Sequence, residues 1–211
     1  MKFKLLYTLI AGLMLSISNY SNASLIDVDF TVDGDTWLKP WSITNNSTDG
    51  VEIDKFIFDL RPLLTYCFDI SGTDCNQSSG TMFTPDSGAA ATGYDSYLLS
   101  DEPGGLANHD FLEINFDDFG IGETFQWLID VDSLSASTVF GNELIGSDAW
   151  VHMSDGNAYF GHLVAVAGNS DASTFEISET YRIAVSEPDT LLILGLGLMA
   201  FGARRLRLNN K

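Results

Sequence analysis

The sequence has little positive charge. Only 10 of its 211 residues are Lys or Arg, against 29 Asp or Glu. Six of the bases and two of the acids lie in segments 1–23 and 187–211, so residues 24–186 keep 27 acids and 4 bases, a net charge of −23. A chain so negative repels nucleic acid and anionic lipid, which disfavours both as partners, and we expect no nucleic-acid binding. The charge favours a soluble exported protein, and divalent-cation binding is the alternative explanation.

Motifs of the common hydrolases and nucleotide-binding enzymes are absent. There is no Gly-x-Ser-x-Gly, no His-Glu-x-x-His and no glycine-rich phosphate loop. Only three histidines are present, and although His109 beside Asp110 could act as a base, no motif places a nucleophile near it. We therefore expect a protein that is not an enzyme, with a secreted hydrolase as the alternative.

Cysteine is nearly absent too. The two cysteines, Cys67 and Cys75, enclose a Gly-Thr-Asp turn, and no histidine is close to them in the sequence. This excludes a soft-ligand metal site of the zinc type. In an exported chain such a pair is expected to form a disulfide.

The first 23 residues have the pattern of a secretory signal peptide. Lys2 and Lys4 precede an apolar stretch, and the segment closes with small residues before a cleavage site between Ala23 and Ser24. The alternative is an uncleaved anchor, but the apolar stretch is shorter than the roughly 20 residues of a spanning helix. We expect signal peptidase to remove residues 1–23.

The last residues combine an apolar segment with a basic end. Residues 191–203 are apolar or glycine throughout, and Arg204, Arg205, Arg207 and Lys211 follow. Because basic residues resist crossing a membrane, they should stay cytoplasmic while residues 24–186 are exported. A helix over 191–203 would rise only about 20 Å, which predicts a short transmembrane segment and a transient inner-membrane tether. A buried core helix is the alternative.

This end of the chain resembles the PEP-CTERM sorting signal of Gram-negative bacteria that make exopolysaccharide. The resemblance rests on Glu187-Pro188, Thr190, the apolar run and the arginines at 204, 205 and 207. The family pattern Val-Pro-Glu-Pro-Ser-Thr reads Val-Ser-Glu-Pro-Asp-Thr here, with Ser186 and Asp189 as the departures. The resemblance implies that an exosortase recognises Glu187-Pro188, removes the tail, and releases or attaches the protein at the cell surface or in the extracellular matrix.

The middle of the chain alternates apolar and polar residues with a period of two, as half-buried antiparallel strands do. The inward positions are Ile26, Val28, Phe30 and Val32; Phe125, Trp127, Ile129 and Val131; and Phe175, Ile177, Tyr181, Ile183 and Val185. No helical periodicity occurs between the termini. We predict an all-β domain over 24–184, a two-layer antiparallel β-sandwich or jelly roll of eight to ten strands. Segment 71–110, rich in Gly, Ser and Ala, fits no clear strand pattern.

Asp155-Gly156 predicts a β-hairpin between two runs of strand formers. With a two-residue loop, Val151 would face Phe160 and Trp150 would face Gly161. In that register His152 and His162 point to opposite faces, which argues against a shared metal site.

Several carboxylates at expected strand ends are candidate ligands for a structural calcium ion. They are Asp33 and Asp35; Asp117, Asp118 and Glu123; and Asp130 and Asp132. The alternative is that these acids lie on solvent-facing strand positions and bind nothing. We expect no other cofactor.

The four tryptophans suggest carbohydrate binding, because sugar rings stack on indole faces. Trp127 shares the inward register and should be core, whereas Trp37, Trp41 and Trp150 are the candidates for an exposed platform. We expect a non-enzymatic surface or matrix protein associated with exopolysaccharide in a biofilm. A hydrolase of polysaccharide and a cohesive cell–matrix structural protein are the alternatives.

Overall fold

The computed structural model describes residues 25–71, 75, 80–101 and 109–182. The predicted signal peptide, its cleavage site at Ala23-Ser24, the sorting residues between 187 and 207 and the apolar segment 191–203 all lie outside the described residues. In the part of the chain that is described, no helix is long and apolar enough to cross a membrane.

Strands make up most of the described chain, and its only helical elements are two short 3-10 turns. The strands are β1 (Val28–Asp33), β2 (Trp41–Asn45), β3 (Ile53–Asp59), β4 (Tyr66–Phe68), β5 (Thr84–Ser87), β6 (Tyr94–Ser100), β7 (Phe111–Phe119), β8 (Thr124–Leu128), β9 (Val131–Ser133), β10 (Asp148–Met153), β11 (Asn157–Ala165) and β12 (Ala172–Arg182). The 3-10 turns are η1 (Arg61–Leu63) and η2 (Gly141–Leu144).

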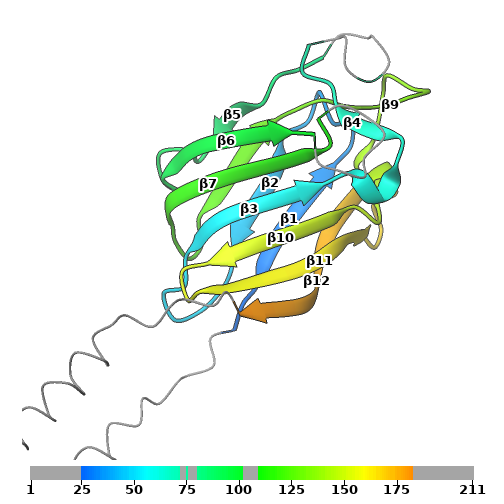
Figure 1. Cartoon of the computed structure of the whole chain (residues 1–211). Coiled ribbons are helices and arrows are strands. Elements are labelled where there is room, and N and C mark those ends of the chain that lie inside the picture. Colours follow the sequence, from blue (N-terminus) through cyan, green and yellow to red (C-terminus); the bar gives the residue numbers. More distant parts are fainter. Residues whose placement is uncertain (1–24, 72–74, 76–79, 102–108, 183–211) are drawn as a thin grey trace, which may run out of the picture.

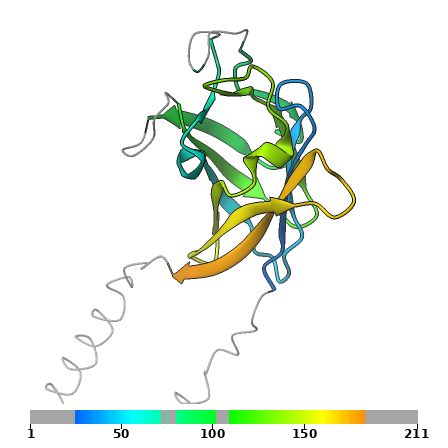
Figure 2. The same cartoon turned by 90° about the vertical axis from the view of Figure 1, so that its right-hand side faces the viewer.

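Ten of the strands form one antiparallel sheet in the order β5-β8-β2-β1-β12-β11-β10-β3-β7-β6, and β4 pairs with β9 in a small second sheet. The large sheet curls so that its two halves face each other: β6, β7, β3 and β10 lie in front of β2 and β1 in Figure 1. From the side, green β6 and β7 lie across the domain from blue β1 and β2, with β11 and β12 below (Figure 2). The domain is therefore an all-β antiparallel sandwich, as predicted, whose two layers are halves of one sheet.

Aromatic side chains fill the space between the two halves. Phe30 of β1 lies 4.6 Å from Phe56 and 5.5 Å from Phe58 of β3, measured between ring centroids. Trp127 of β8 stacks parallel to Phe30 at 5.9 Å and is fully buried. The alternation read from the sequence in β1 and β8 is confirmed, because Val28, Phe30, Val32, Phe125, Trp127, Ile129 and Val131 are all buried.

The hairpin of β10 and β11 exists, but the predicted register was wrong. Trp150 faces Phe160 rather than Gly161, and Val151 faces Tyr159. The loop has three residues, 154–156, and ends at Gly156 with φ of 79°, the left-handed conformation that a three-residue hairpin loop needs. One added loop residue shifts every pair by one, so His152 and His162 share a face instead of pointing apart.

Segment 71–110 contains two strands that the sequence did not reveal. β5 and β6 are the two edges of the large sheet and are joined by the turn over 88–93. Phe83, just before β5, stacks on Tyr97 of β6 at 4.3 Å, which holds the two edges near each other. The period-two pattern is missing in β5 because all four of its residues are exposed.

Candidate functional site

Three buried aspartates meet at the small sheet. Asp69, Asp130 and Asp132 are exposed by 0%, 2% and 0%, and each offers a carboxylate oxygen within 4.8 Å of those of the other two. We call these three residues the acidic cluster. Among the residues that the structure describes, no other group of His, Cys, Asp or Glu comes together in this way.

Pairing of β4 with β9 creates the cluster. Phe68 faces Val131 in this ladder, and the N–H of Asp69 donates to the carbonyl of Asp130 at 3.0 Å, so these two acids follow as cross-strand neighbours. All three residues of β9 are buried. The sequence interpretation that Asp130 and Asp132 lie on a solvent-facing side was therefore wrong, because the small sheet covers the side of the segment opposite the core.

Burial and, second, repulsion between the carboxylates disfavour the charged form of Asp130. Burial, followed by the charges of Asp132, Asp69 and Asp35, raises the pKa of Asp130 to about 7, and a hydrogen bond from the N–H of Val131 offsets this only in part. No basic side chain contributes to that pKa. The buried Oδ1 of Asp130 has no hydrogen-bond partner among the described residues. Such an arrangement favours either a proton or a cation at this position.

The predicted disulfide is confirmed and borders the cluster. Cys67 and Cys75 are bonded, with 5.9 Å between their Cα atoms. Cys67 faces Asp132 across the small sheet, and the Sγ of Cys75 lies 3.4 Å from the carbonyl oxygen of Asp132. The covalent link thus holds residue 75 against the strand that carries Asp132.

The other calcium candidates do not assemble. Asp33 is exposed and accepts a hydrogen bond from Asn169 at 2.8 Å. Asp117 and Asp118 are exposed, and Glu123 accepts a hydrogen bond from the N–H of Gly120 within the turn between β7 and β8. Asp35 contributes to the field at Asp130. Sequence reasoning missed Asp69, because nothing in the local sequence connects it with residues 130–132.

A second group of candidate side chains lies on the outer face of β11, β10, β3 and β7. Phe160, Trp150 and Ile57 are cross-strand partners in one row, which continues to Glu113. Paired residues point to the same side of a sheet, and this side faces away from the core that holds Val151 and Ala149. The rings of Trp150 and Phe160 lie 4.9 Å apart and both side chains are partly exposed. We call Phe160, Trp150 and Ile57 the aromatic row.

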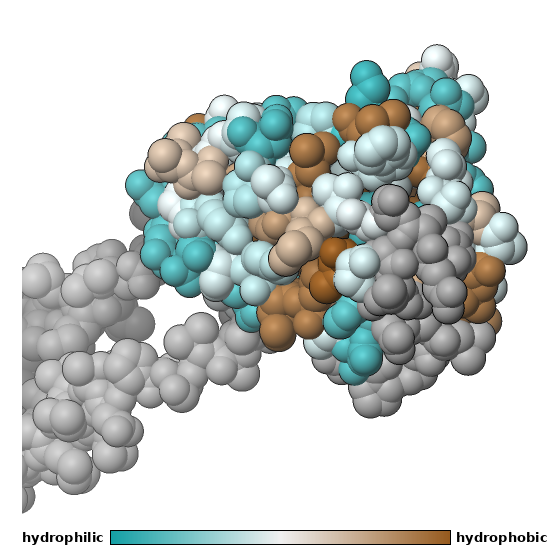
Figure 3. Space-filling view, turned by 90° about the horizontal axis from the view of Figure 1, so that it is seen from above, coloured by the Kyte–Doolittle hydropathy of each residue, from teal (hydrophilic) through white to brown (hydrophobic). Residues whose placement is uncertain are grey.

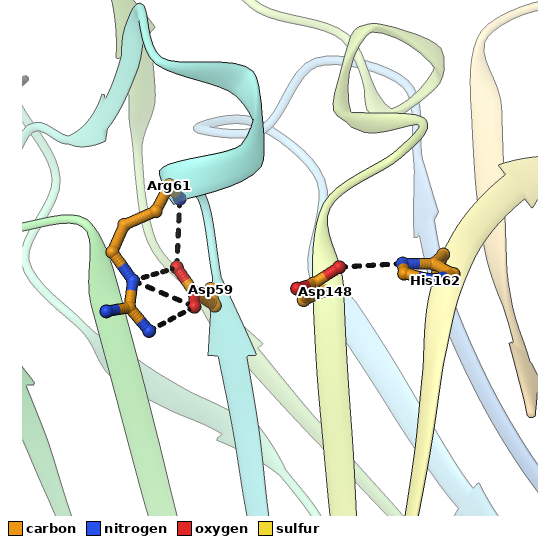
Figure 4. Close-up of polar contacts among 4 residues, drawn as sticks. All are labelled: Asp59, Arg61, Asp148 and His162. Atoms are coloured by element: carbon orange, nitrogen blue, oxygen red, sulfur yellow. Dashed lines mark hydrogen bonds and ion pairs between the residues drawn. The ribbon is translucent and has the colours of Figure 1, made fainter. Parts of the chain in front are cut away.

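Charged residues flank the aromatic row on one side. Asp148 and Asp59 are neighbours across β10 and β3, and each has a basic partner (Figure 4). The Nδ1 of His162 lies 2.6 Å from Asp148, and Arg61 contacts Asp59 through Nε at 2.9 Å and Nη2 at 2.5 Å. Burial raises the pKa of Asp148, and the hydrogen bond and charge of His162 oppose this.

Polar residues flank the row on the other side. His152 pairs with Lys55, and the Nζ of Lys55 lies 2.9 Å from Glu113. Burial, followed by the positive charge of Lys55, lowers the pKa of His152. Hydrogen-bonding groups therefore border the aromatic row on both sides.

The remaining predicted platform tryptophans lie elsewhere. Trp37 is 44% exposed in the turn before β2. Trp41 is fully buried and its indole N–H donates to the carbonyl of Thr36, so its assignment to an exposed platform was wrong. The reason is alternation: Trp41, Ile43 and Asn45 are all buried, and Trp41 pairs with Trp127.

Hydrophobic side chains also reach the surface. Seen from above, brown residues form a band between teal and pale polar residues (Figure 3). Exposed large hydrophobic residues include Leu64, Met82, Leu98 and Leu134. The surface is thus mixed, not uniformly acidic.

Comparison with known families matches only the C-terminal end of the chain. Residues 184–207 match the family model described as the PEP-CTERM protein-sorting motif. Neither the curated proteins nor the solved structures gave a match. The resemblance read from Glu187-Pro188, the apolar run and the arginines is confirmed. The chain thus carries a PEP-CTERM sorting motif, which marks it as an exported, surface-associated protein of Gram-negative bacteria with an exosortase as its processing partner.

Proposed function

We propose that this protein is a non-enzymatic polysaccharide-binding protein of the cell surface or extracellular matrix, and that its aromatic row is the binding surface. The observation that supports this most directly is the row itself. Trp150 and Phe160 lie side by side on a sheet face, with Ile57 beside them. Three adjacent strands span about 10 Å, a flat apolar surface on which sugar rings can stack.

The flanking polar groups provide the second part of the argument. A sugar that stacks on the row would extend its hydroxyl groups toward Asp148 and His162 on one side and Lys55 on the other. Binding sites typically combine apolar contact area with a few polar groups that fix orientation. The sorting motif also supports the proposal of polysaccharide binding, because it directs the protein to the cell surface.

Charge indicates which polysaccharides are suitable. Residues 24–186 carry a net charge of −23, so an anionic polymer would be repelled at low salt. We therefore propose neutral polysaccharide as the ligand class.

Binding can be measured with the protein secreted by an exosortase-bearing host and with neutral exopolysaccharide purified from that host. We expect Trp150→Ala to weaken binding at least about 10-fold, because an aromatic residue at the centre of a contact surface contributes more than about 1.4 kcal/mol. Trp37→Ala is the matched control, since Trp37 is exposed and belongs to none of the strands that carry the row. Equal loss in both variants, or no loss with Trp150→Ala, contradicts the proposal.

We also propose that residues 191–203 tether the protein transiently in the inner membrane before release. Replacing both Glu187 and Pro188 with alanine keeps the apolar run and the arginines. Full-length protein should then accumulate in the membrane fraction, whereas the parent yields a shorter surface or secreted species. If the variant leaves the membrane as the parent does, these two residues are not the recognition element.

A further inference from the structure

We propose that the acidic cluster of Asp69, Asp130 and Asp132 binds one calcium ion. The three carboxylates are almost fully buried, and their oxygens lie within 4.8 Å of one another, the spacing of ligands around a single cation. Carboxylates of like charge so close together and away from water require a compensating positive charge.

Asp130 provides an independent indication of a ligand. Its side chain is 2% exposed and its Oδ1 finds no hydrogen-bond partner among the described residues. Buried polar atoms in folded proteins are almost always satisfied, so an unsatisfied oxygen on one of three neighbouring carboxylates indicates a bound ion.

The donor set selects calcium over other ions. All of the ligands are carboxylate oxygens, which suit hard cations, whereas zinc prefers His and Cys ligands. Magnesium gives up its water reluctantly and usually keeps several water ligands. Since the carboxylates have almost no contact with solvent, an ion held between them must lose most of its water, and calcium does so more easily.

The surrounding chain is built to hold the cluster in place. A side chain at Gly80 would meet the carbonyl oxygen of Asp69 at 2.4 Å and its Oδ1 at 2.7 Å, so only glycine allows the chain to pass here. Across the cluster, the disulfide between Cys67 and Cys75 fixes the chain beside Asp132. The ligands therefore lie beside a disulfide and a close backbone contact, which both restrict the chain around them.

The test uses the full secreted protein, stripped with EDTA and then titrated with calcium chloride by calorimetry and thermal melting. We expect one site in the parent and a melting temperature that rises with calcium concentration. Asp130→Asn should bind calcium at least 10-fold more weakly, since ligand charge sets affinity. In EDTA the same variant should melt at a higher temperature than the parent, because it removes one buried charge.

Asp33→Asn is the control, because it removes an exposed acid of the same type. It should bind calcium as the parent does. Asp132→Asn repeats the test if Asp130→Asn does not fold. The proposal is overturned if the parent and both cluster variants bind calcium equally, or if magnesium binds the parent as tightly as calcium does.

Discussion

The acidic cluster and the outer face of the large sheet both contain aspartates, but the side chains around these aspartates differ in charge. On the outer face, Asp59 has Arg61 and Asp148 has His162 within hydrogen-bonding distance. In the cluster, the charges that act on Asp130 are those of Asp132, Asp69 and Asp35. The two outer-face acids thus each have a basic partner, whereas every charge that acts on Asp130 is negative.

Position in the fold explains this difference. The basic partners of the outer-face acids reach them from partly exposed positions, since the side chains of Arg61 and His162 are 29% and 47% exposed. The cluster lies between the small sheet and the core, and the described chain has only a few basic residues to supply. The proposed calcium ion would supply the positive charge that Asp130 lacks.

The largest expected effect is a difference in stability between tryptophan variants on the core side and on the outer side of the large sheet. Trp127→Ala removes a fully buried indole that contacts Phe30 and Phe56, so it should lower the free energy of unfolding by roughly 3–5 kcal/mol. Trp150→Ala, on the outer face, should lower it by only about 1 kcal/mol. Urea denaturation of both variants checks this, and equal destabilisation would show that the two faces are misassigned.

The disulfide should stabilise the cluster side. Replacing Cys67 and Cys75 together with alanine should cost about 2–3 kcal/mol by the loop-entropy relation. Because residue 75 lies against Asp132, calcium affinity should fall as well. Denaturation and calcium titration of the double variant test both effects, and reduction of the parent should reproduce them. Unchanged calcium affinity would mean that the bond does not position the ligands.

The two ion pairs of the outer face should differ in strength. Arg61→Ala leaves the buried carboxylate of Asp59 without its guanidinium, which should cost about 1–3 kcal/mol. His162→Ala should cost less than about 1 kcal/mol, because its side chain is 47% exposed. Chemical denaturation at low and high salt measures both. The opposite order would mean that the exposed pair is the structural one.

The smallest effect concerns pH on the outer face. Folding lowers the pKa of His152, through burial first and the charge of Lys55 second, so the folded state disfavours its protonation. The stability that neutral His152 provides is therefore complete above its unfolded pKa of about 6.5 and is lost as the pH falls below that value. His152→Gln should lose less stability between pH 7 and pH 5.5 than the parent. Parallel pH curves for the two proteins would contradict this.

Much of the large sheet could be predicted from local pattern. Period-two alternation identified the inward residues of β1 and β8. Successive residues of a strand point to opposite faces of the sheet, so the pattern along one strand is enough to assign each side chain to a face. The same reasoning gave the wrong pairing for Trp150, since one additional loop residue changes the register of a hairpin. It also placed Trp41 at the surface, although Trp41 is the first residue of a strand whose alternate residues are buried.

By itself, the sequence determined the all-β class, the cysteine pair and the sorting motif, which depend on neighbouring residues or on spacing along the chain. Only the tertiary structure decided that Asp69 meets Asp130 and Asp132, and that Trp150, Phe160 and Ile57 form a row. These groups come from segments far apart in the sequence. Whether such segments meet depends on strand pairing, which is set by how the whole core packs and not by any local pattern.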